Sequence, residues 1–317
     1  TSPKEVKAMI DGVNKRSSGF ELGSIVDHLL TNDAPISDSY LIIENKLTDK
    51  LKDWATRCFE IMLTTREGDV LNLLTDTIIL RARNEVEYDS RLKNETALQK
   101  FNDSGAFEYY SALEMARSSN RTIISSDSLE YAENLVISTQ FEPSTAFYLD
   151  PSNFTKQFKQ LELFAELWGI ECKGKPDIVD VDESDKIVYI VDVKTYAGNF
   201  VSNFWKYHYY LQTPFYGELF KKCYPEYADY EYKYINVTID TTGANKPEVY
   251  ELSHSLVAYM LEDYSSISTA DVMEIMDKYS KNISTIPSLI TELKWHIQND
   301  KWDHRYRYYE LNKNMIG

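Results

Sequence analysis

Two neighbouring stretches decide the fold: Gly174-Lys175-Pro176-Asp177-Ile178, and Lys186 to Lys194, which reads KIVYIVDVK. The second stretch is rich in Val and Ile, the composition of a strand that is buried on both faces. Side chains alternate along a strand, so Asp192 and Lys194 should point to the same side. The linker from Asp182 to Asp185 is polar and short, as a hairpin turn would be, and Asp177 lies near the start of a preceding strand over 172–181. We therefore expect two acids and a lysine to converge at one edge of a small sheet.

This combination of residues suits the metal-assisted hydrolysis of a phosphodiester. Magnesium prefers carboxylate oxygens and keeps several waters, one of which can be the nucleophile. A neighbouring lysine can orient or deprotonate that water, or stabilise the charge that develops on the phosphate. The alternative is a plain hairpin with a surface Asp and Lys, because the tripeptide D-x-K on its own is common.

The motif reads Pro176-Asp177, fourteen residues, then Asp192-Val193-Lys194, and it resembles the signature of the PD-(D/E)XK nuclease superfamily. Further along, Gln212 and Tyr216 resemble the Q-x-x-x-Y element of the RecB-like branch. The surroundings are most similar to RecE-type exonucleases (exonuclease VIII) and other phage-type exonucleases. The resemblance is specific over about 164–220 and looser over 19–30.

This resemblance implies an α/β fold with a restriction-endonuclease-like core, in which a small mixed central β-sheet is flanked by helices and carries helical insertions. It implies a magnesium ion, replaceable by manganese, with Asp177, Asp192 and Val193 as ligands. Lys194 would be the catalytic lysine. Gln212 and Tyr216 would position Lys194 or the DNA backbone.

A third metal ligand is expected from the stretch Gly23 to His28, which resembles the G-x-x-x-H element that opens these nuclease domains. Four residues after Gly23 stands Asp27 rather than a histidine, and His28 follows one place late. Helical spacing puts Asp27 on the face of Gly23, turned by about 100° from His28. An acid can replace histidine as an oxygen ligand, so we favour Asp27. His28, or a merely polar pair on an amphipathic helix, remains the alternative.

Four further residues are candidates for substrate binding. Lys173 and Lys175 flank Asp177 closely enough to contact phosphate, or they are exposed charges. Trp205 and His208 fall on the same face as Gln212 if the segment 203–220 is one helix, which Pro214 should then kink. Acids at 162, 166 and 171 lie on the wet face of an edge strand, where we expect them to be solvated.

The composition is that of a globular protein, with 43% hydrophobic and 26% charged residues. The net charge of −16 is unusual for a protein that binds nucleic acid, but the region 153–222 holds nine Lys against ten Asp and Glu. The three cysteines are scattered, so they indicate neither a disulfide framework nor a zinc cluster, and they argue against the iron–sulfur nucleases, which need four cysteines. With neither a signal-peptide pattern nor an apolar run of about 20 residues, we expect a protein of the bacterial or phage-infected cytoplasm.

We expect one nuclease domain over 1–317. Its core would comprise about 19–35 and 120–252, with strands near 122–125 and 161–167 and a second hairpin over 230–252. A helical insertion would occupy about 44–119, and a helical cap would close the chain over about 253–317.

The function expected from these features is a magnesium-dependent deoxyribonuclease, of the exonuclease type found in recombination and phages. DNA would be the substrate, and a single-strand annealing or recombination protein is a candidate partner, as is a second copy in an oligomer. The alternatives are a non-cleaving binding protein on a nuclease scaffold and an endonuclease of the same superfamily.

Overall fold

The computed structural model describes Lys7 and residues 19–44, 47–65, 74–265, 267–279 and 283–302. The chain divides into two compact units. The sheet unit comprises Thr1–Asn32 with Leu135–Gly317, and the helical unit comprises Asp33–Asn134. The last part of the predicted C-terminal cap, 303–317, lies outside the described residues.

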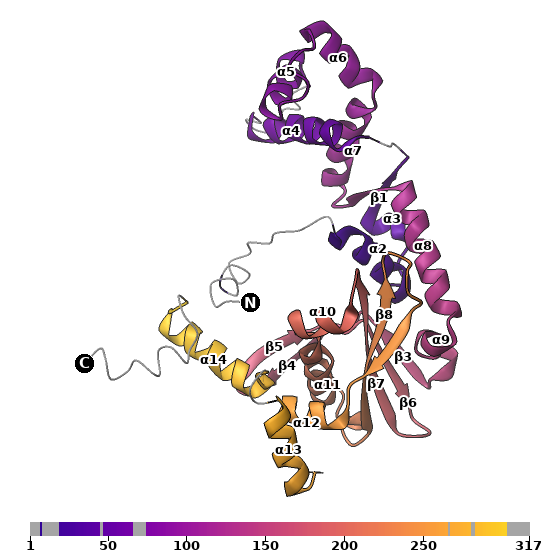
Figure 1. Ribbon diagram of the computed structural model, residues 1–317, viewed down its shortest axis with the longest axis vertical. Coiled ribbons are helices and arrows are strands. Elements are labelled where there is room, and N and C mark those ends of the chain that lie inside the picture. Colours follow the sequence, from indigo (N-terminus) through magenta and orange to yellow (C-terminus); the bar gives the residue numbers. More distant parts are fainter. Residues whose placement is uncertain are drawn as a thin grey trace, which may run out of the picture. The chain divides into compact units, whose positions relative to one another are not determined.

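A five-stranded mixed sheet forms the centre of the sheet unit (Figure 1). The strands β7 and β8 are parallel, whereas the other neighbouring pairs are antiparallel. In spatial order the strands are β3 (Lys156–Lys159), β6 (Ile178–Asp182), β7 (Ile187–Tyr196), β8 (Glu231–Asp240) and β9 (Glu248–Glu251). This architecture confirms the predicted α/β fold and both predicted hairpins.

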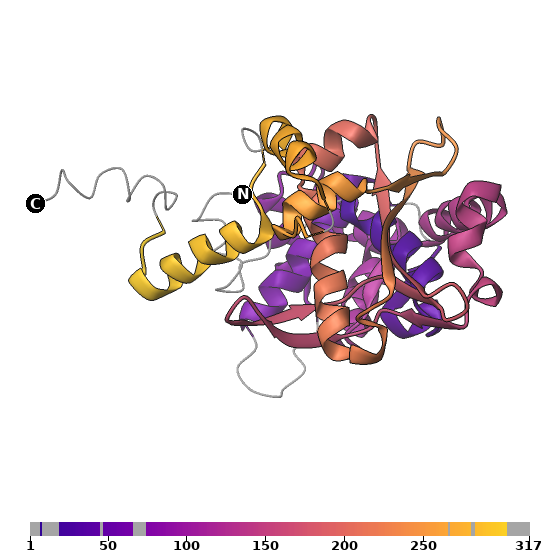
Figure 2. The same cartoon turned by 90° about the horizontal axis from the view of Figure 1, so that it is seen from below.

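Helices cover both faces of this sheet (Figures 1 and 2). The helix α11 (Gln212–Cys223) packs on one face. It lies so close to the sheet that a Cβ on Gly217 would be 2.7 Å from the Tyr234 ring. On the other face packs α9 (Pro143–Leu149), whose Phe147 and Tyr148 rings contact Tyr189 of β7. The sheet is therefore buried on both sides, as the Val- and Ile-rich strand predicted.

The predicted strand over 172–181 is wrong, because two strands occupy it. The strand β5 (Ile170–Gly174) pairs with β4 (Leu163–Leu167) in a separate hairpin, turned at Trp168 and Gly169. The chain then leaves that hairpin through Pro176, which has no N–H for a ladder, before β6 begins. Asp177 therefore lies between two strands rather than inside one.

The connection from β7 to β8 also differs from the prediction, since 203–220 is not one helix. It consists of α10 (Phe200–Lys206), a short 3₁₀ turn (Tyr209–Leu211) and α11. The break falls at His208, whose φ of 59° is left-handed. Pro214 lies in the first turn of α11, where its missing N–H costs no hydrogen bond, so it does not kink a helix.

The remaining helices of the sheet unit enlarge its core. The first is α2 (Gly19–Thr31), whose Ile25 and Val26 are fully buried. After β9 come three helices that supply core side chains such as Leu256, Ile275 and Ile290. They are α12 (His254–Leu261), α13 (Thr269–Tyr279) and α14 (Ile286–Asn299). These confirm the predicted helices after residue 253 as far as 302.

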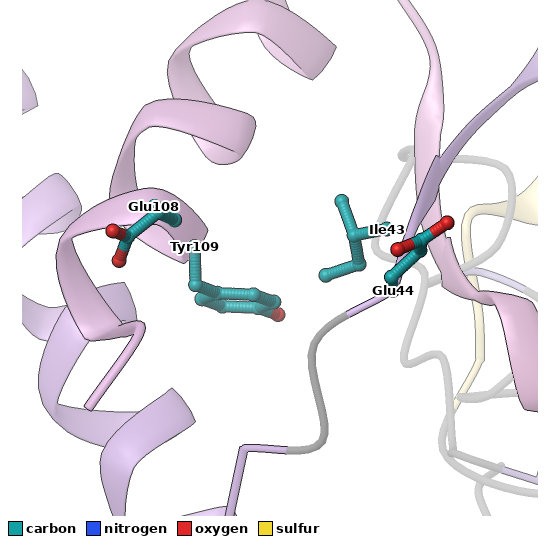
Figure 3. Close-up of a pocket in the computed structure, with 4 residues that line it drawn as sticks. All are labelled: Ile43, Glu44, Glu108 and Tyr109. Carbon is teal, nitrogen blue, oxygen red and sulfur yellow. The ribbon is translucent and has the colours of Figure 1, made fainter.

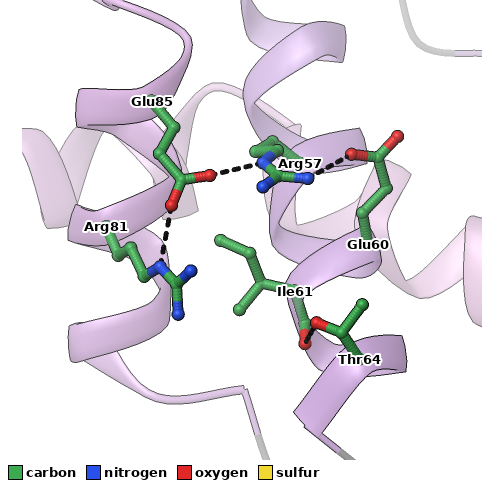
Figure 4. A network of polar contacts seen from close by, with 6 residues as sticks. All are labelled: Arg57, Glu60, Ile61, Thr64, Arg81 and Glu85. Atoms are coloured by element: carbon green, nitrogen blue, oxygen red, sulfur yellow. Dashed lines mark hydrogen bonds and ion pairs between the residues drawn. The ribbon is translucent and has the colours of Figure 1, made fainter.

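The helical unit has a core of its own, centred on Trp54 and Phe101, both fully buried. Its elements are α3 (Ile36–Ser39), β1 (Tyr40–Ile43), α4 (Asp49–Thr65), α5 (Asp76–Glu85), α6 (Asn94–Asp103), α7 (Ala106–Ser118) and β2 (Thr122–Ser125). The Arg57–Glu85 ion pair joins α4 to α5, while Arg57 also pairs with Glu60 within α4 and Arg81 with Glu85 within α5 (Figure 4). The pairing of β1 with β2 is parallel and was not predicted.

The helix α8 (Ser126–Phe141) connects the two units in the sequence, since the division between them falls at Asn134 and Leu135. Of the helices that the structure describes, none combines the length and the apolar character needed to cross a membrane.

Candidate active site

Asp192 and Lys194 lie on the same side of β7, as the alternation of side chains predicted. Lys194 Nζ lies 2.5 Å from Asp192 Oδ2, and the two side chains are only 16% and 3% exposed. The strand is central in the sheet. At Asp192 and Lys194 it pairs with Asn236 and Thr238 of β8, whereas its ladder with β6 ends at Val191. The result is a buried ion pair at the carboxyl half of β7.

Asp177 directly precedes β6 and is aligned with Asp192 of the neighbouring strand β7. Ile178 pairs with Val191, so Asp177, one residue earlier, falls opposite Asp192. Its position is fixed by the main chain of β7, because the Val193 N–H donates to Asp177 Oδ2 at 2.7 Å. The three residues of the motif are therefore brought together as expected.

The helix α2 brings Asp27 to the same group. A Cβ on Gly23 would lie 2.6 Å from Thr195 Oγ1, so α2 approaches β7 more closely than a larger residue would permit. One turn later stands Asp27, which is half-buried and lies within the electrostatic range of Asp192, Lys194 and Lys175. His28 is 8% exposed. The structure thus puts Asp27 beside the carboxylates, and its role as a ligand stays a prediction.

Asp27 and Asp177 are joined by two residues that the sequence did not single out. The Thr31 hydroxyl lies 3.1 Å from Asp27 Oδ1 and 2.8 Å from the main-chain oxygen of the same residue. Gln160 Nε2 donates to Thr31 Oγ1 at 2.7 Å and to Asp177 Oδ1 at 3.3 Å. Gln160 follows the short edge strand β3 in a left-handed conformation, with φ of 49°. No sequence signal pointed to it.

Two acids of this group, Asp177 and Asp27, resist ionisation. Burial, followed by the charges of Asp192 and Asp27, raises the pKa of Asp177 well above its usual range. Burial also raises the pKa of Asp27, with the Asp192 charge adding to it and the Thr31 hydrogen bond opposing it. For Lys194, burial lowers the pKa, but the neighbouring carboxylates outweigh it and the net pKa is raised. The carboxyl groups crowded here therefore outnumber the one lysine among them, Lys194.

The donors of this site fit a hard divalent cation. Asp192 Oδ2 is buried, and the Lys194 ammonium lies 2.5 Å from it. Across the described stretches, no three Asp, Glu, His or Cys side chains are placed so that they could hold a metal ion by themselves. Magnesium characteristically binds through one or two carboxylates and completes its shell with waters and substrate phosphate oxygens. An open oxygen set of this kind suits it.

On α11, Gln212 and Tyr216 are one turn apart, and Tyr216 lies within the electrostatic range of Asp192 and Lys194. Burial raises the pKa of Tyr216 to about 12, and the charge of Asp192 adds to this effect. A Cβ on Gly174 would lie 2.9 Å from the Tyr216 ring, which ties β5 to the helix. Gln212 Oε1 is buried and meets no donor in the part of the chain that the structure describes.

The candidate substrate-binding residues lie in different surroundings. Lys175 is exposed, and its charge lowers the pKa of Asp27, so it is near the carboxylates. Lys173 lies on the β4–β5 hairpin, 3.5 Å from Glu162 and 4.8 Å from the centre of the Phe164 ring. Because the helix is broken, Trp205 and His208 do not continue the face of Gln212.

Trp205 lines a cavity of about 270 Å³ with Phe200, Phe204 and residues of β9 and α12. His208 Nδ1 lies 2.7 Å from Tyr210 Oη. The break also brings Tyr209 to the ion pair, since Lys194 Nζ lies 5.1 Å from the centre of the Tyr209 ring.

A larger cavity, of about 470 Å³, belongs to the helical unit (Figure 3). It is lined by Ile43, Glu44, Glu108 and Tyr109, with the Tyr109 ring directed toward Ile43. It contains neither the lysine nor the acids of the motif, so it is not part of the candidate site.

The model of the PD-(D/E)XK nuclease superfamily matches residues 79–304. No curated protein matches the sequence. Among solved structures, a candidate exonuclease from Eubacterium rectale is 11% identical, with 84% of this chain and 88% of that chain covered and a TM-score of 0.33. The family assignment rests on the sequence match, which spans more than half of the chain and includes the motif of Asp177, Asp192 and Lys194. The chain belongs to the PD-(D/E)XK nuclease superfamily.

Proposed function

We propose that this chain is a magnesium-dependent deoxyribonuclease that works as an exonuclease of the RecE type. The observation that carries the proposal is the convergence of Asp177, Asp192 and Lys194 on one buried edge of β7, with Asp27 beside them. Three mutually repelling carboxylates and one lysine are more than a structural ion pair needs. They match what phosphodiester hydrolysis requires, namely a cation site and a positive charge next to it.

Asp177 and Asp192 would hold the magnesium ion, and Asp27 and Val193 would complete the protein's share of its ligands. A bound magnesium ion polarises a phosphate oxygen and makes its own water more acidic. Manganese would substitute, because it accepts the same oxygen donors. Thr31 and Gln160 would keep Asp27 and Asp177 at a fixed separation.

Lys194 would stabilise the negative charge that develops on the phosphate. The neighbouring carboxylates raise its pKa, which favours the ammonium form over an amine that could take a proton from water. A preorganised charge in a buried site is worth more than the same charge in water. Gln212 and Tyr216 would position this ammonium or the DNA backbone, and Lys175, with Lys173 farther out, would contact phosphates.

The test is a digestion of end-labelled linear DNA and of covalently closed circular DNA, each with magnesium or with a chelator. We expect nucleotides to be released from linear DNA with magnesium only, and circular DNA to stay intact. The Asp192→Asn variant should lose roughly 10³-fold in rate, since it removes a charge that binds the cation. Cleavage that survives chelation, or full activity of the variant, would refute the metal site.

Opening of the circular DNA would instead identify an endonuclease. DNA binding without any cleavage would identify a binding protein on a nuclease scaffold. A single-strand annealing partner and an oligomeric state are part of the same proposal. Size-exclusion chromatography, alone and with a candidate annealing protein, tests them.

A further inference from the structure

We propose that Tyr207 and Tyr209 form a stacking platform for a nucleobase of the DNA strand that is being cut, directly beside Lys194. This inference rests on the proposed function, since it names the part of DNA that the candidate site would hold next to the scissile phosphate. The platform is the pair of rings at the break between α10 and the 3₁₀ turn.

The two rings form a continuous path from the ion pair to the surface. Lys194 Nζ lies 5.1 Å from the centre of the Tyr209 ring, and the Tyr207 ring follows at 5.8 Å with an angle of 32° between the planes. Tyr207 is 52% exposed, whereas Tyr209 is half-buried. The exposed Tyr207 ring is thus connected to Lys194 through one intervening ring, that of Tyr209.

The break in the helix is what brings these rings together. In a continuous helix, side chains two residues apart point to different sides and do not face each other. The left-handed His208, with φ of 59°, turns the chain so that Tyr207 and Tyr209 come to the same side. A non-glycine residue in this conformation costs free energy, and here it produces a paired aromatic surface.

A firm backing holds the inner ring in place. Tyr209 stacks on Phe200 at 6.3 Å and 24°, and Phe200 is 4% exposed. Phe200 in turn packs against Tyr250 of β9 at 4.9 Å. The Tyr207 ring is therefore supported by a series of aromatic contacts that extends to β9, the edge strand of the central sheet.

The chemistry of the surroundings favours a nucleobase of a DNA strand as the occupant. Bases stack on aromatic side chains without sequence preference, and strand-binding grooves combine such rings with positive charge. Lys206 provides that charge, since its Nζ lies 5.0 Å from the centre of the Tyr207 ring. A base that displaces this ammonium from the ring leaves it free to pair with a backbone phosphate. With Lys194 on the inner side, the platform has positive charge at both ends.

The experiment is a double-mutant cycle, in which removal of the Tyr207 ring is combined with removal of single bases from the DNA strand. A short single-stranded oligonucleotide with an internal fluorophore is bound in calcium in place of magnesium, and a set of versions carries one abasic residue moved along the strand. Fluorescence anisotropy gives the affinity of wild type, Tyr207→Ala and Tyr207→Phe for each version.

We expect Tyr207→Ala to weaken binding of the intact strand by roughly 5- to 100-fold, and Tyr207→Phe to retain it. At one abasic position the loss should disappear, because the base that stacks on the ring is already absent. Phe147→Ala, which removes a ring of similar exposure from the opposite face of the sheet, should leave affinity unchanged.

An equal loss for every version of the strand, no loss at all, or no binding of DNA would overturn the platform. The two proposals fail separately. A chain that shows the coupling but cuts no DNA keeps the platform and loses the nuclease activity. A chain that cuts DNA without any coupling loses only the platform.

Discussion

Gln160 and Thr31, which are 129 residues apart in the sequence, are joined by a hydrogen bond of 2.7 Å from Nε2 to Oγ1. The same amide group reaches Asp177 Oδ1 at 3.3 Å, and the Thr31 hydroxyl reaches Asp27 Oδ1 at 3.1 Å. One glutamine therefore couples the acid on α2 to the acid before β6. In the proposed metal site, Gln160 and Thr31 would orient the ligands Asp27 and Asp177.

Gln160→Ala should raise the magnesium concentration that gives half-maximal cleavage by about 10- to 100-fold, because Asp27 and Asp177 lose their shared donor. Alanine accepts the left-handed backbone at this position no better and no worse than glutamine, so the effect is not one of strain. The measurement is a magnesium titration of the cleavage rate.

Gln157→Ala is the matched control for this variant. It also removes a glutamine of the β3 segment that donates to a buried acid, in this case Asp180 at 2.9 Å. Its magnesium requirement should stay that of wild type. If both variants shift alike, the link between Thr31 and Asp177 has no special role.

Gln212→Ala should lower turnover by roughly 10- to 100-fold while changing the melting temperature by no more than a few degrees. Gln212 Oε1 is buried and, within the described residues, has no donor, so its removal leaves no partner unsatisfied. The comparison is with Thr213→Val, whose hydroxyl is equally buried and without a described partner but points about 100° away on the helix. A large drop in melting temperature with normal specific activity would make Gln212 a core residue.

Much of the central sheet could be predicted because its signals are local. The run from Lys186 to Lys194 is apolar and β-branched, and the turns before β7 and after β8 are polar, so both hairpins follow from pattern alone. Side-chain alternation also predicted the pairing of Asp192 with Lys194. These residues are close in sequence, and the strand period of two determines where they point.

The parts that could not be predicted depend on tertiary contacts. The break at His208 has no sequence signal, because no Gly stands there and the nearest Pro is six residues later, at Pro214. The sequence pattern therefore predicts a helix that continues through the break. In the fold, Tyr210 is buried and its hydroxyl meets His208 Nδ1 at 2.7 Å, which fixes the turn. Likewise β3 is a four-residue edge strand with polar ends, and Gln160 acquires its role only because α2 packs over β7.

Asp27→Ala should lose most of the magnesium-dependent activity, and His28→Ala should lose little activity per folded molecule. The close packing of Gly23 on Thr195 sets Asp27 beside Asp192, and magnesium favours carboxylate over imidazole. His28 is 8% exposed, so its truncation should lower the melting temperature instead. Magnesium and manganese titrations of both variants decide between them. An inactive, well-folded His28→Ala would transfer the ligand role to the histidine.

A different buried acid should control stability rather than activity. Asp180 on β6 is fully buried, and burial raises its pKa from 3.8 to about 7, although the Gln157 hydrogen bond opposes the rise. Its second oxygen, Oδ2, has no donor among the residues that the structure describes. The folded state therefore prefers the protonated acid, whereas the unfolded chain ionises near pH 4.

Because the folded pKa is the higher one, the free energy of unfolding should fall as pH rises from about 4 through about 7, and stay low above that. Asp180→Asn keeps the shape without the charge, so it should be more stable than wild type at pH 8, by up to about 4 kcal/mol, with the gain vanishing near pH 4.

Asp182→Asn on the same strand should behave in the opposite way. Its carboxylate accepts hydrogen bonds from Ser184 and Asp185, which lower its pKa, so that variant should lose stability above pH 4. Urea unfolding from pH 4 to pH 8 measures both variants, and a gain for Asp180→Asn that does not grow with pH would show that the acid is not ionised at a cost in the folded protein.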